Sequence, residues 1–289
     1  MTGDSHVTVT CGATVAVLGP GAVGGALAVR LALAGEQVVC VARHETAEVI
    51  AREGLALEHA GSVLRARPRA VEELDEQVDL LLVTVKASDL AAALGRVRSE
   101  PRLVLPLLNG LEHMETLRAR FARVAAATIG RFEAYREETA LIVQKSSSAV
   151  VTVADGESVP MLERASVEVR TGGTEQDVLL EKLARLAPLA ALTAATQRTI
   201  GELRVDPRLA VGIEEACAVA AADGAHTSPA DQWAIITAMA PDLTTSAARD
   251  VAAGRPSELD AIVGGVVRAG RRLGVPTPTL EELLALCPA

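Results

Sequence analysis

The sequence predicts an α/β protein in two parts: a doubly wound parallel sheet with helices on its faces, followed by an all-helical region. Its 289 residues exceed the usual length of one domain. As far as Leu108, short aliphatic runs alternate with helical segments, which is typical of parallel β-α-β folds. After Thr174 the pattern is helical throughout. We therefore expect two domains, residues 1–175 and residues 176–289.

A strand, a glycine-rich turn and a helix open the sheet region. The run Thr14–Leu18 predicts a buried strand, and the segment from Gly25 to Ala34 predicts a helix that stops at Gly35. A second strand completes a unit with a right-handed crossover. Its aliphatic residues, like those of the later strands, do not alternate with polar ones, as in strands buried on both faces. The further elements predicted here are the strands Val38–Val41, Asp79–Val85 and Leu103–Leu108 and the helix Ala47–Glu53.

The pattern changes between Ala125 and Val169, where β-prone pieces are separated by Gly, Ser and Asp. We expect three such pieces to extend the sheet in a mixed arrangement: Thr139–Val143, Ala149–Val153 and Ser166–Val169. Capping and stop residues then mark four clear helices. These are Glu175–Leu192, Pro207–Asp223, Ser228–Ala240 and Pro256–Leu273.

The composition excludes several classes of function. A formal charge of −9 argues against nucleic acid as a partner, because the phosphate backbone favours clustered cations, and four aromatic residues are too few for a base-stacking surface. The uncharged stretch from Ser5 to Val29 is interrupted by glycine and proline, so it predicts neither a membrane span nor a signal peptide. The cysteines fit no metal-binding spacing and indicate reduced thiols in a cytoplasmic protein. They are Cys11, Cys40, Cys217 and Cys287.

The glycine-rich turn predicts a dinucleotide site. It follows a strand and opens a helix, which is the context in which glycines let the backbone approach a pyrophosphate at a helix N-terminus. The motif comprises Gly19, Pro20, Gly21, Ala22, Val23 and Gly24. The alternative is a glycine-rich turn that binds no ligand.

The end of the second strand favours NADP(H) over NAD(H). An NAD site usually has Asp or Glu there, whereas this chain has Arg43 with His44 beside it. A guanidinium fits a 2′-phosphate with two hydrogen bonds. The alternative is an arginine that is only exposed at a strand end.

Lysine and asparagine are rare in this chain. Of 28 basic residues three are lysine (Lys86, Lys145 and Lys182), and Asn109 is the sole asparagine. Lys86 and Asn109 each end a predicted parallel strand, so we expect both side chains at the crevice that holds the glycine turn. Either residue could instead be a surface or turn residue, since Asn-Gly is a common turn pair.

Two residues of the helical region are further candidates. Lys182 has apolar neighbours, which predicts a place at the edge of a buried face, although most helical lysines lie in solvent. Glu258 is expected in the first turn of the helix that begins at Pro256, where the helix dipole keeps a carboxylate ionised. Ordinary helix capping explains the same glutamate.

The sequence resembles the ketopantoate reductase (2-dehydropantoate 2-reductase) family. The matching segments are GPGAVGG at Gly19–Gly25, VKASDL at Val85–Leu90, LNGLE at Leu108–Glu112, the helix from Lys182 to Thr193, GEL at Gly201–Leu203, Thr245–Asp260 and Arg271–Thr279. The resemblance implies an N-terminal Rossmann domain, a helical C-terminal domain, a site in the cleft between them, and NADPH as cofactor. A homodimer is also compatible with it.

The resemblance also implies roles for single residues. Lys182 matches the catalytic lysine, Glu258 the active-site glutamate, which also contacts the cofactor, and Ser246 the substrate-binding serine. Asn109 matches the asparagine between cofactor and substrate, and Lys86 and Arg43 match basic residues that hold the cofactor. The implied reaction transfers a hydride to the carbonyl carbon of a 2-oxo acid, while a lysine supplies the proton.

The chain departs from the family where the substrate is recognised. Leu186 and Ala190 stand where the family has asparagines, which predicts a less polar cleft. Val263 replaces a further asparagine that the resemblance implies after the glutamate. The substrate is then ketopantoate, as in pantothenate biosynthesis, or a more apolar 2-oxo acid. Two alternatives stay open: an NADP-binding protein that has lost catalysis, and a dehydrogenase of hydroxy acids or imines on the same scaffold.

Overall fold

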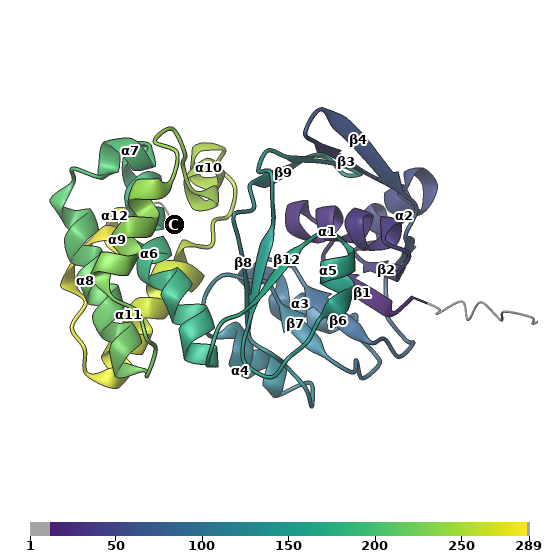
Figure 1. Ribbon diagram of the computed structural model, residues 1–289, viewed down its shortest axis with the longest axis horizontal. Coiled ribbons are helices and arrows are strands. Elements are labelled where there is room, and N and C mark those ends of the chain that lie inside the picture. Colours follow the sequence, from purple (N-terminus) through teal and green to yellow (C-terminus); the bar gives the residue numbers. More distant parts are fainter. Residues whose placement is uncertain (1–11, 288–289) are drawn as a thin grey trace, which may run out of the picture.

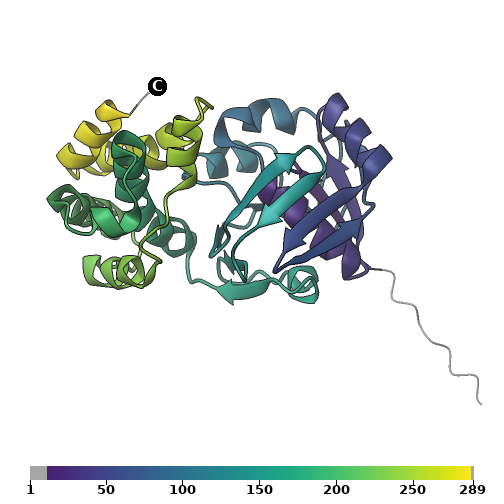
Figure 2. The same ribbon diagram turned by 90° about the horizontal axis from the view of Figure 1, so that it is seen from above.

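The computed structural model describes residues 12–287 and shows two halves side by side (Figure 1). The sheets lie in one half, and the helices from α6 onward form the other, as the view from above also shows (Figure 2). The predicted fold class, a parallel sheet with helices followed by a helical region, is confirmed. Cys11, one of the predicted free thiols, lies outside the described residues; Cys40, Cys217 and Cys287 are free.

A five-stranded parallel sheet forms the centre of the first half. Its strand order is β5-β2-β1-β6-β7, and every neighbouring pair is parallel. The strands are β1 (Thr14–Leu18), β2 (Gln37–Val41), β5 (Arg69–Val71), β6 (Leu80–Val83) and β7 (Val104–Pro106). The four predicted strands of this sheet are present, and the two later ones are shorter than predicted.

Both faces of this sheet are buried. Val15 and Val17 of β1 pack into one apolar core, which also contains α1 (Ala22–Leu33). Ala16 and Leu18 point to the opposite face and join a second core. That face is covered by α3 (Leu90–Leu94) and α4 (His113–Arg118), with the 3₁₀ turn η1 (Ala87–Asp89) before α3. The continuous aliphatic character of these strands follows from this double burial.

The predicted extension of the parallel sheet is wrong, because the β-prone pieces form two separate sheets. One has the order β4-β3-β10-β9 and the other β12-β11-β8. Helix α1 contacts strands of the first of these sheets as well as β1 and β2, so it lies between two sheets and keeps them apart. The strands concerned are β3 (Leu55–His59), β4 (Ser62–Ala66), β8 (Ala127–Gly130), β9 (Ala134–Glu138), β10 (Leu141–Gln144), β11 (Val150–Val153) and β12 (Glu168–Thr171); α2 (His44–Glu53) and α5 (Pro160–Arg164) complete this half.

Helix α6 (Glu175–Thr196) is the axis of the helical half. Thr174 caps it in a reciprocal arrangement with Asp177, which explains why the helix begins there. The other helices pack around it on one shared apolar core. They are α7 (Ile200–Leu203), α8 (Pro207–Ala222), α9 (Pro229–Ala238), α10 (Ser246–Ala252), η2 (Asp260–Gly264), α11 (Gly265–Leu273) and α12 (Pro278–Leu286).

The predicted start of the helix at Pro256 is wrong. Residues 255–257 are loop, and the helix begins with the π-helical turn η2 and continues as α11. The carbonyl oxygen of Glu258 accepts the N–H of Ile262, so Glu258 stands directly before the helix and not in its first turn. The Pro256 carbonyl accepts a hydrogen bond from Lys86 instead of starting a helix.

Candidate active site

The glycine-rich turn lies at the carboxyl end of β1. Gly19 has a φ of +84°, which glycine adopts without strain, and its N–H donates to the Val41 carbonyl at 3.0 Å. Gly21 is the N-cap of α1, and no side chain of residues 12–287 caps this helix. The atom nearest to a Cβ placed on Gly21 would be the Gly19 carbonyl oxygen, 4.0 Å away. This end of α1 therefore has room for a pyrophosphate, at the positive end of a helix.

Gly24 packs the start of α1 against the strand edge. A Cβ on Gly24 would lie 2.2 Å from Thr84 Oγ1 and 2.6 Å from the Gly19 carbonyl oxygen. The Thr84 hydroxyl donates to the carbonyls of Gly19 and Leu18, so it ties the turn to the end of β6. Sequence reasoning missed Thr84, although a lone hydroxyl after an aliphatic strand was a visible signal. The other motif residues are Pro20 between the two glycines and Ala22 and Val23 at the start of α1.

Arg43 lies at the carboxyl end of β2, next to the turn. It is exposed and is the N-cap residue of α2. Arg96 brings a second guanidinium to this corner, because its Nη1 donates to the carbonyls of Ala42 at 3.5 Å and Glu72 at 3.3 Å. Sequence reasoning missed Arg96, since only the folded sheet brings residue 96 beside residue 42.

Lys86 bridges the two halves. Its Nζ donates to Asp250 Oδ2 and to the Pro256 carbonyl, each at 2.7 Å. Asp250 lies on α10 and also pairs with Arg255 at 2.8 Å. Lys86 thus uses two of its three N–H groups in hydrogen bonds within the protein. Both partners belong to the helical half, so this half holds the ammonium group that follows β6.

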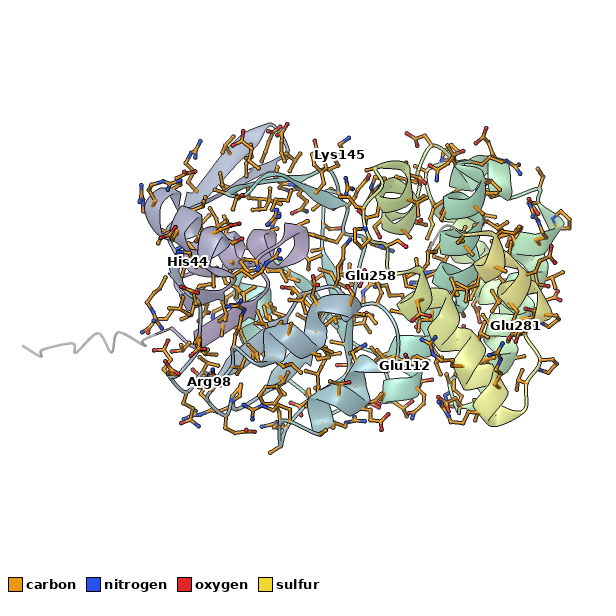
Figure 3. All side chains as sticks on the ribbon, turned by 180° about the vertical axis from the view of Figure 1, so that it is seen from behind. His44, Arg98, Glu112, Lys145, Glu258 and Glu281 are labelled. Atoms are coloured by element: carbon orange, nitrogen blue, oxygen red, sulfur yellow. The ribbon has the colours of Figure 1, made fainter. Side chains whose placement is uncertain are left out.

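Asn109 joins the two charged residues of the helical half. Lys182 Nζ donates to Asn109 Oδ1 at 2.8 Å, and Asn109 Nδ2 donates to Glu258 Oε2 at 3.1 Å. The other oxygen of Glu258 accepts the N–H of Ala87 at 3.3 Å. Three residues predicted from the sequence therefore come together where the halves meet, at the place labelled Glu258 in Figure 3.

Gly110 allows this close approach. Its φ is +101°, and a Cβ there would lie 2.7 Å from the Ala261 carbonyl oxygen of η2. A larger residue would push the backbone of the helical half away from the end of β7.

Lys182 has an altered acidity. Burial lowers its pKa to about 8, and the nearby charge of Arg185 acts in the same direction, while the carboxylate of Glu258 raises it. A lysine of this kind is a cation near neutral pH and can release its proton.

His113, at the start of α4, is a buried titratable group that sequence reasoning missed. Neither ring nitrogen has a hydrogen-bond partner among residues 12–287, and 5% of the residue is exposed. Burial, and next the charge of Lys182, lower the pKa of His113 to about 4, so the ring is neutral near pH 7. Its position four residues after Asn109 was the available signal.

Ser246 and the three apolar replacements lie at different depths. Ser246 is the first residue of α10 and is exposed, with no hydrogen bond to Asn109, Lys182 or Glu258 in the described chain. Leu186 keeps part of its surface exposed, one turn after Lys182. Ala190 and Val263 are fully buried in the helical core. Of the three predicted replacements, Leu186 is therefore the one that keeps an accessible surface.

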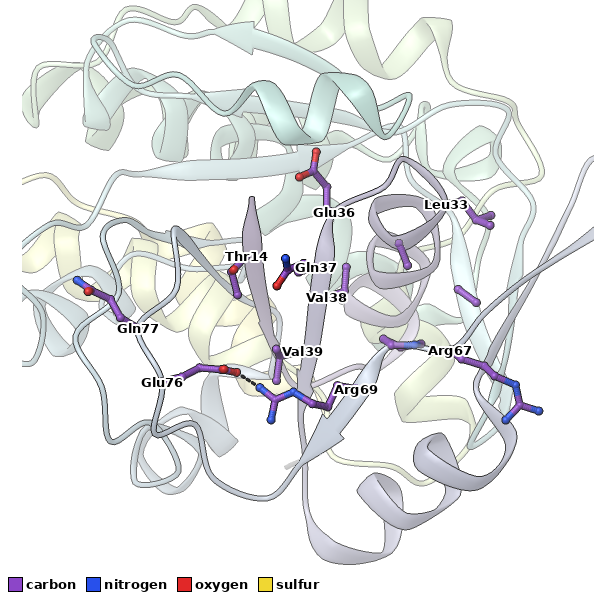
Figure 4. A pocket seen from close by; sticks show the side chains of 13 residues that line it. Thr14, Leu33, Glu36, Gln37, Val38, Val39, Arg67, Arg69, Glu76 and Gln77 are labelled. Carbon is purple, nitrogen blue, oxygen red and sulfur yellow. Dashed lines mark ion pairs between the residues drawn. The ribbon is translucent and has the colours of Figure 1, made fainter. Parts of the chain in front are cut away.

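Other features of residues 12–287 lie away from this site. A cavity of about 640 Å³ opens at the amino ends of β1 and β2, opposite to the glycine turn, where Arg69 pairs with Glu76 (Figure 4). These residues contain no cluster of three or more His, Cys, Asp or Glu side chains that could hold a metal ion. None of their helices has the length and apolar character needed to cross a membrane.

A glycine turn with room for a pyrophosphate, and a lysine with lowered pKa at the junction of the two halves, are parts expected of a nucleotide-dependent oxidoreductase. Comparison with known families supports this class. Residues 15–157 match the model described as "Ketopantoate reductase PanE/ApbA", and residues 176–289 match "Ketopantoate reductase PanE/ApbA C terminal". The chain belongs to the ketopantoate reductase family.

Individual relatives agree with this assignment. The chain is 29% identical to a 2-dehydropantoate 2-reductase of Caulobacter vibrioides, over 94% of this chain and 97% of that protein. It is similar to the crystal structure of a PanE/ApbA family ketopantoate reductase from Ralstonia eutropha JMP134, with 30% identity, a TM-score of 0.84 and coverage of 94% and 96%. The ternary structure of D-mandelate dehydrogenase with NADH and anilino(oxo)acetate shares the fold at 21% identity, with the same TM-score and coverage.

Proposed function

We propose that this enzyme reduces a 2-oxo acid to a 2-hydroxy acid with NADPH. The observation that carries the proposal is the hydrogen-bonded set Lys182–Asn109–Glu258 at the junction of the halves. It places an ammonium group with a pKa of about 8 at the end of β7, the edge at which parallel sheets bind their ligands.

The cofactor would lie along the carboxyl ends of β1, β2 and β6. The turn Gly19–Gly24 would hold the pyrophosphate, because its N-cap glycine leaves open space. Arg43 would hold the 2′-phosphate, supported by Arg96 and by the third N–H group of Lys86. When bound, NADPH supplies the hydride that reaches the carbonyl carbon of the substrate.

The protein would supply the proton and stabilise the developing charge. Lys182 donates to the oxygen that becomes the hydroxyl group, and its cationic form stabilises the alkoxide character that precedes this transfer. Asn109 orients the ammonium through a 2.8 Å hydrogen bond. Glu258, held by Asn109 and by the Ala87 N–H, offsets part of the cost of burying the charge. Ser246 would bind the substrate from α10.

The substrate we propose is ketopantoate or a 2-oxo acid with a more apolar side chain. The second candidate is favoured by Leu186, which presents an apolar side chain one turn from Lys182. A less polar pocket binds a hydroxylated side chain poorly, because buried polar groups then lack partners.

A substrate panel tests the proposal. NADPH consumption is measured with ketopantoate and with branched and aromatic 2-oxo acids. Lys182→Met should abolish turnover, whereas Lys145→Met should not change it, because Lys145 lies over the Tyr135 ring and is none of the residues that the proposal assigns to substrate or cofactor. NADPH binding without turnover on any substrate would support a protein that has lost catalysis. Cytoplasmic location and a homodimer stay predictions, to be tested by cell fractionation and sedimentation.

A further inference from the structure

Arg185 is a second cation beside Lys182. It lies three residues later on α6, so the two side chains project from neighbouring positions of one helix face. Its Nη1 donates to the Glu181 carbonyl and to Gln232 Oε1, each at 3.0 Å. The Glu181 carboxylate is 3.9 Å from the same nitrogen and is half exposed. Arg185 therefore lacks a close carboxylate partner within residues 12–287.

The contacts of Arg185 leave one edge of its guanidinium open. All of them involve Nη1, and in the described part of the chain Nε and Nη2 have no partner. Neither of these nitrogens is among the fully enclosed atoms, and the side chain is 20% exposed. In contrast, Arg123 and Arg268 each bind one carboxylate with two nitrogens. The free Nε–Nη2 edge has the geometry that binds a carboxylate in this way.

Gln232 fixes the position of the Arg185 guanidinium by accepting a hydrogen bond from its Nη1. It is fully buried on α9, and its Nε2 donates to Thr227 Oγ1 at 2.7 Å, which directs Oε1 toward Arg185. An anchored guanidinium loses little side-chain entropy when it binds a ligand, so Arg185 is preorganised to bind an anion.

The electrostatics of α6 also favour an anion here. Arg185 and Lys182 are both partly desolvated cations, and the charge of Arg185 acts on Lys182. Their mutual repulsion is unfavourable and is only partly offset: within residues 12–287 the ammonium of Lys182 hydrogen-bonds a neutral amide, and the Glu258 carboxylate acts on it from beyond that amide. A bound anion between them would remove this cost.

We propose that the Nε–Nη2 edge of Arg185 binds the carboxylate of the substrate, while Lys182 faces its keto oxygen. This inference rests on the proposed function and adds to it: the substrate must carry a free carboxylate next to the ketone, and its side chain lies toward Leu186. Neighbouring side chains on a helix face are about 5–6 Å apart at Cβ, a span that suits the two adjacent oxygen-bearing carbons of a 2-oxo acid. The bound carboxylate would also offset the repulsion and keep Lys182 protonated until it donates.

The test compares an acid with its neutral analogue. For the best 2-oxo acid of the panel and its primary amide, kcat and KM are measured in wild type, Arg185→Gln and Arg185→Lys. Arg185→Gln should raise KM for the acid about 10- to 100-fold, as expected for a lost charge-assisted pair, and leave the amide unchanged. Arg185→Lys should recover part of the loss. The Kd for NADPH should stay the same.

Arg204→Gln is the matched control. Arg204 is also half-buried in the helical half, and its hydrogen bonds within residues 12–287 go to carbonyl oxygens, those of Ile236 and Met239 near the other end of α9. It should lower stability to a similar degree without changing the preference for the acid. Equal losses for acid and amide in Arg185→Gln, or no loss, would overturn the inference, because a structural contact acts on both substrates alike.

A binding measurement separates this inference from the proposed function. Calorimetry with oxalate, in the presence of NADP⁺, should show binding to wild type and Arg204→Gln and at least tenfold weaker binding to Arg185→Gln. If no 2-oxo acid is turned over but this difference is found, the proposed reaction fails and the carboxylate site stands. If turnover is found but oxalate binds all three proteins alike, Arg185 is not the anchor.

Discussion

Asn109 connects groups of opposite charge with the two ends of one amide. Its oxygen accepts from Lys182 and its nitrogen donates to Glu258. A carboxylate at this position could not donate to Glu258, and an aliphatic residue could serve neither partner. The role explains why the chain retains its sole asparagine at the end of β7.

The pKa of Lys182 predicts the pH dependence of the reaction. In the proposed mechanism the reduction needs the protonated amine of Lys182, and burial lowers the pKa of this group to about 8. We expect kcat/KM for reduction to be constant near neutral pH and to fall about tenfold per pH unit above the pKa. Stopped-flow or steady-state assays from pH 6 to about 10 check this. A profile with no alkaline limb would contradict Lys182 as the proton donor.

His113 predicts an acid-sensitive component of stability. Its folded pKa of about 4 lies below the ordinary value of 6.5, so the unfolded chain binds the proton first as pH falls. Stability from this residue is present above pH 6.5 and is lost as pH falls toward 4, by up to about 3 kcal/mol. His113→Leu should remove that loss, measured as the free energy of unfolding in urea at pH 7 and pH 4.5.

A buried neighbour provides the control for His113. Met114 lies next to it on α4 and does not titrate, so Met114→Leu should change the free energy of unfolding equally at both pH values. An unchanged pH slope in His113→Leu would show that another group causes the acid loss.

Single residues were predictable where composition made them rare. Lys86, Asn109 and Lys182 are candidates on sequence alone because lysine and asparagine are scarce, and because two of them follow predicted strands that end at one edge of the sheet. Thr84, Arg96 and His113 were not identified, because common residue types gain meaning only from neighbours that folding brings together. Roles for Ser246 and Arg43 stay predictions.

At the scale of the element, α1 depends on glycines that a side chain would displace. Gly24→Ala would put a methyl group against Thr84 and the Gly19 carbonyl. We expect a loss of about 1–3 kcal/mol in stability and at least tenfold weaker NADPH binding, measured by denaturation and fluorescence titration. Gly265→Ala is the control, since a Cβ there meets no atom of a neighbouring element within 4 Å in the described part of the chain and should stabilise α11 by about 0.5–1 kcal/mol. Unchanged NADPH affinity in Gly24→Ala would contradict the proposed pyrophosphate site.

Elements were predictable where local pattern and capping agree. β1, α1, β2 and α6 follow from aliphatic runs bounded by glycine or by the Thr174 cap. The partners of the later strands could not be derived from local pattern, because α1 separates the sheets and only tertiary packing decides this. Similarly, the sequence predicts a helix start at Pro256. In the structure the Pro256 carbonyl accepts a hydrogen bond from Lys86, and the helix begins after Glu258.

At the scale of the whole molecule, α10 ties the two halves together. Arg249 of this helix contacts Glu133 at 3.4 Å, and Asp250 binds Lys86 at 2.7 Å. The adjacent residues of α10 thus form ion pairs of opposite polarity with the sheet half. The helix that carries Ser246 is therefore held over the junction, near β9 in Figure 1.

Asp250 predicts an effect on cofactor selectivity. Its carboxylate pairs with Lys86 and Arg255, so Asp250→Asn should leave more positive charge for the 2′-phosphate of the proposed cofactor. We expect NADPH to bind several-fold more tightly at low salt and NADH to change less, measured by fluorescence titration. Glu281→Gln, which makes the same charge change in a surface pair with Arg271, should have no such effect. Weaker NADPH binding in Asp250→Asn would show that the ion pair holds Lys86 in its binding position, and that Asp250 does not compete with the cofactor for Lys86.

The pair Asn109-Gly110 also makes this enzyme susceptible to deamidation over time. An asparagine before glycine is the amide most prone to cyclise onto the next backbone nitrogen and hydrolyse to aspartate, and such residues are thermolabile. Here an aspartate at position 109 would place a carboxylate next to Glu258 and remove the Nδ2 group that donates to Glu258. Hydrogen bonds at both ends of the amide restrain its rotation, so we expect the contacts of Asn109 with Lys182 and Glu258 to slow this hydrolysis.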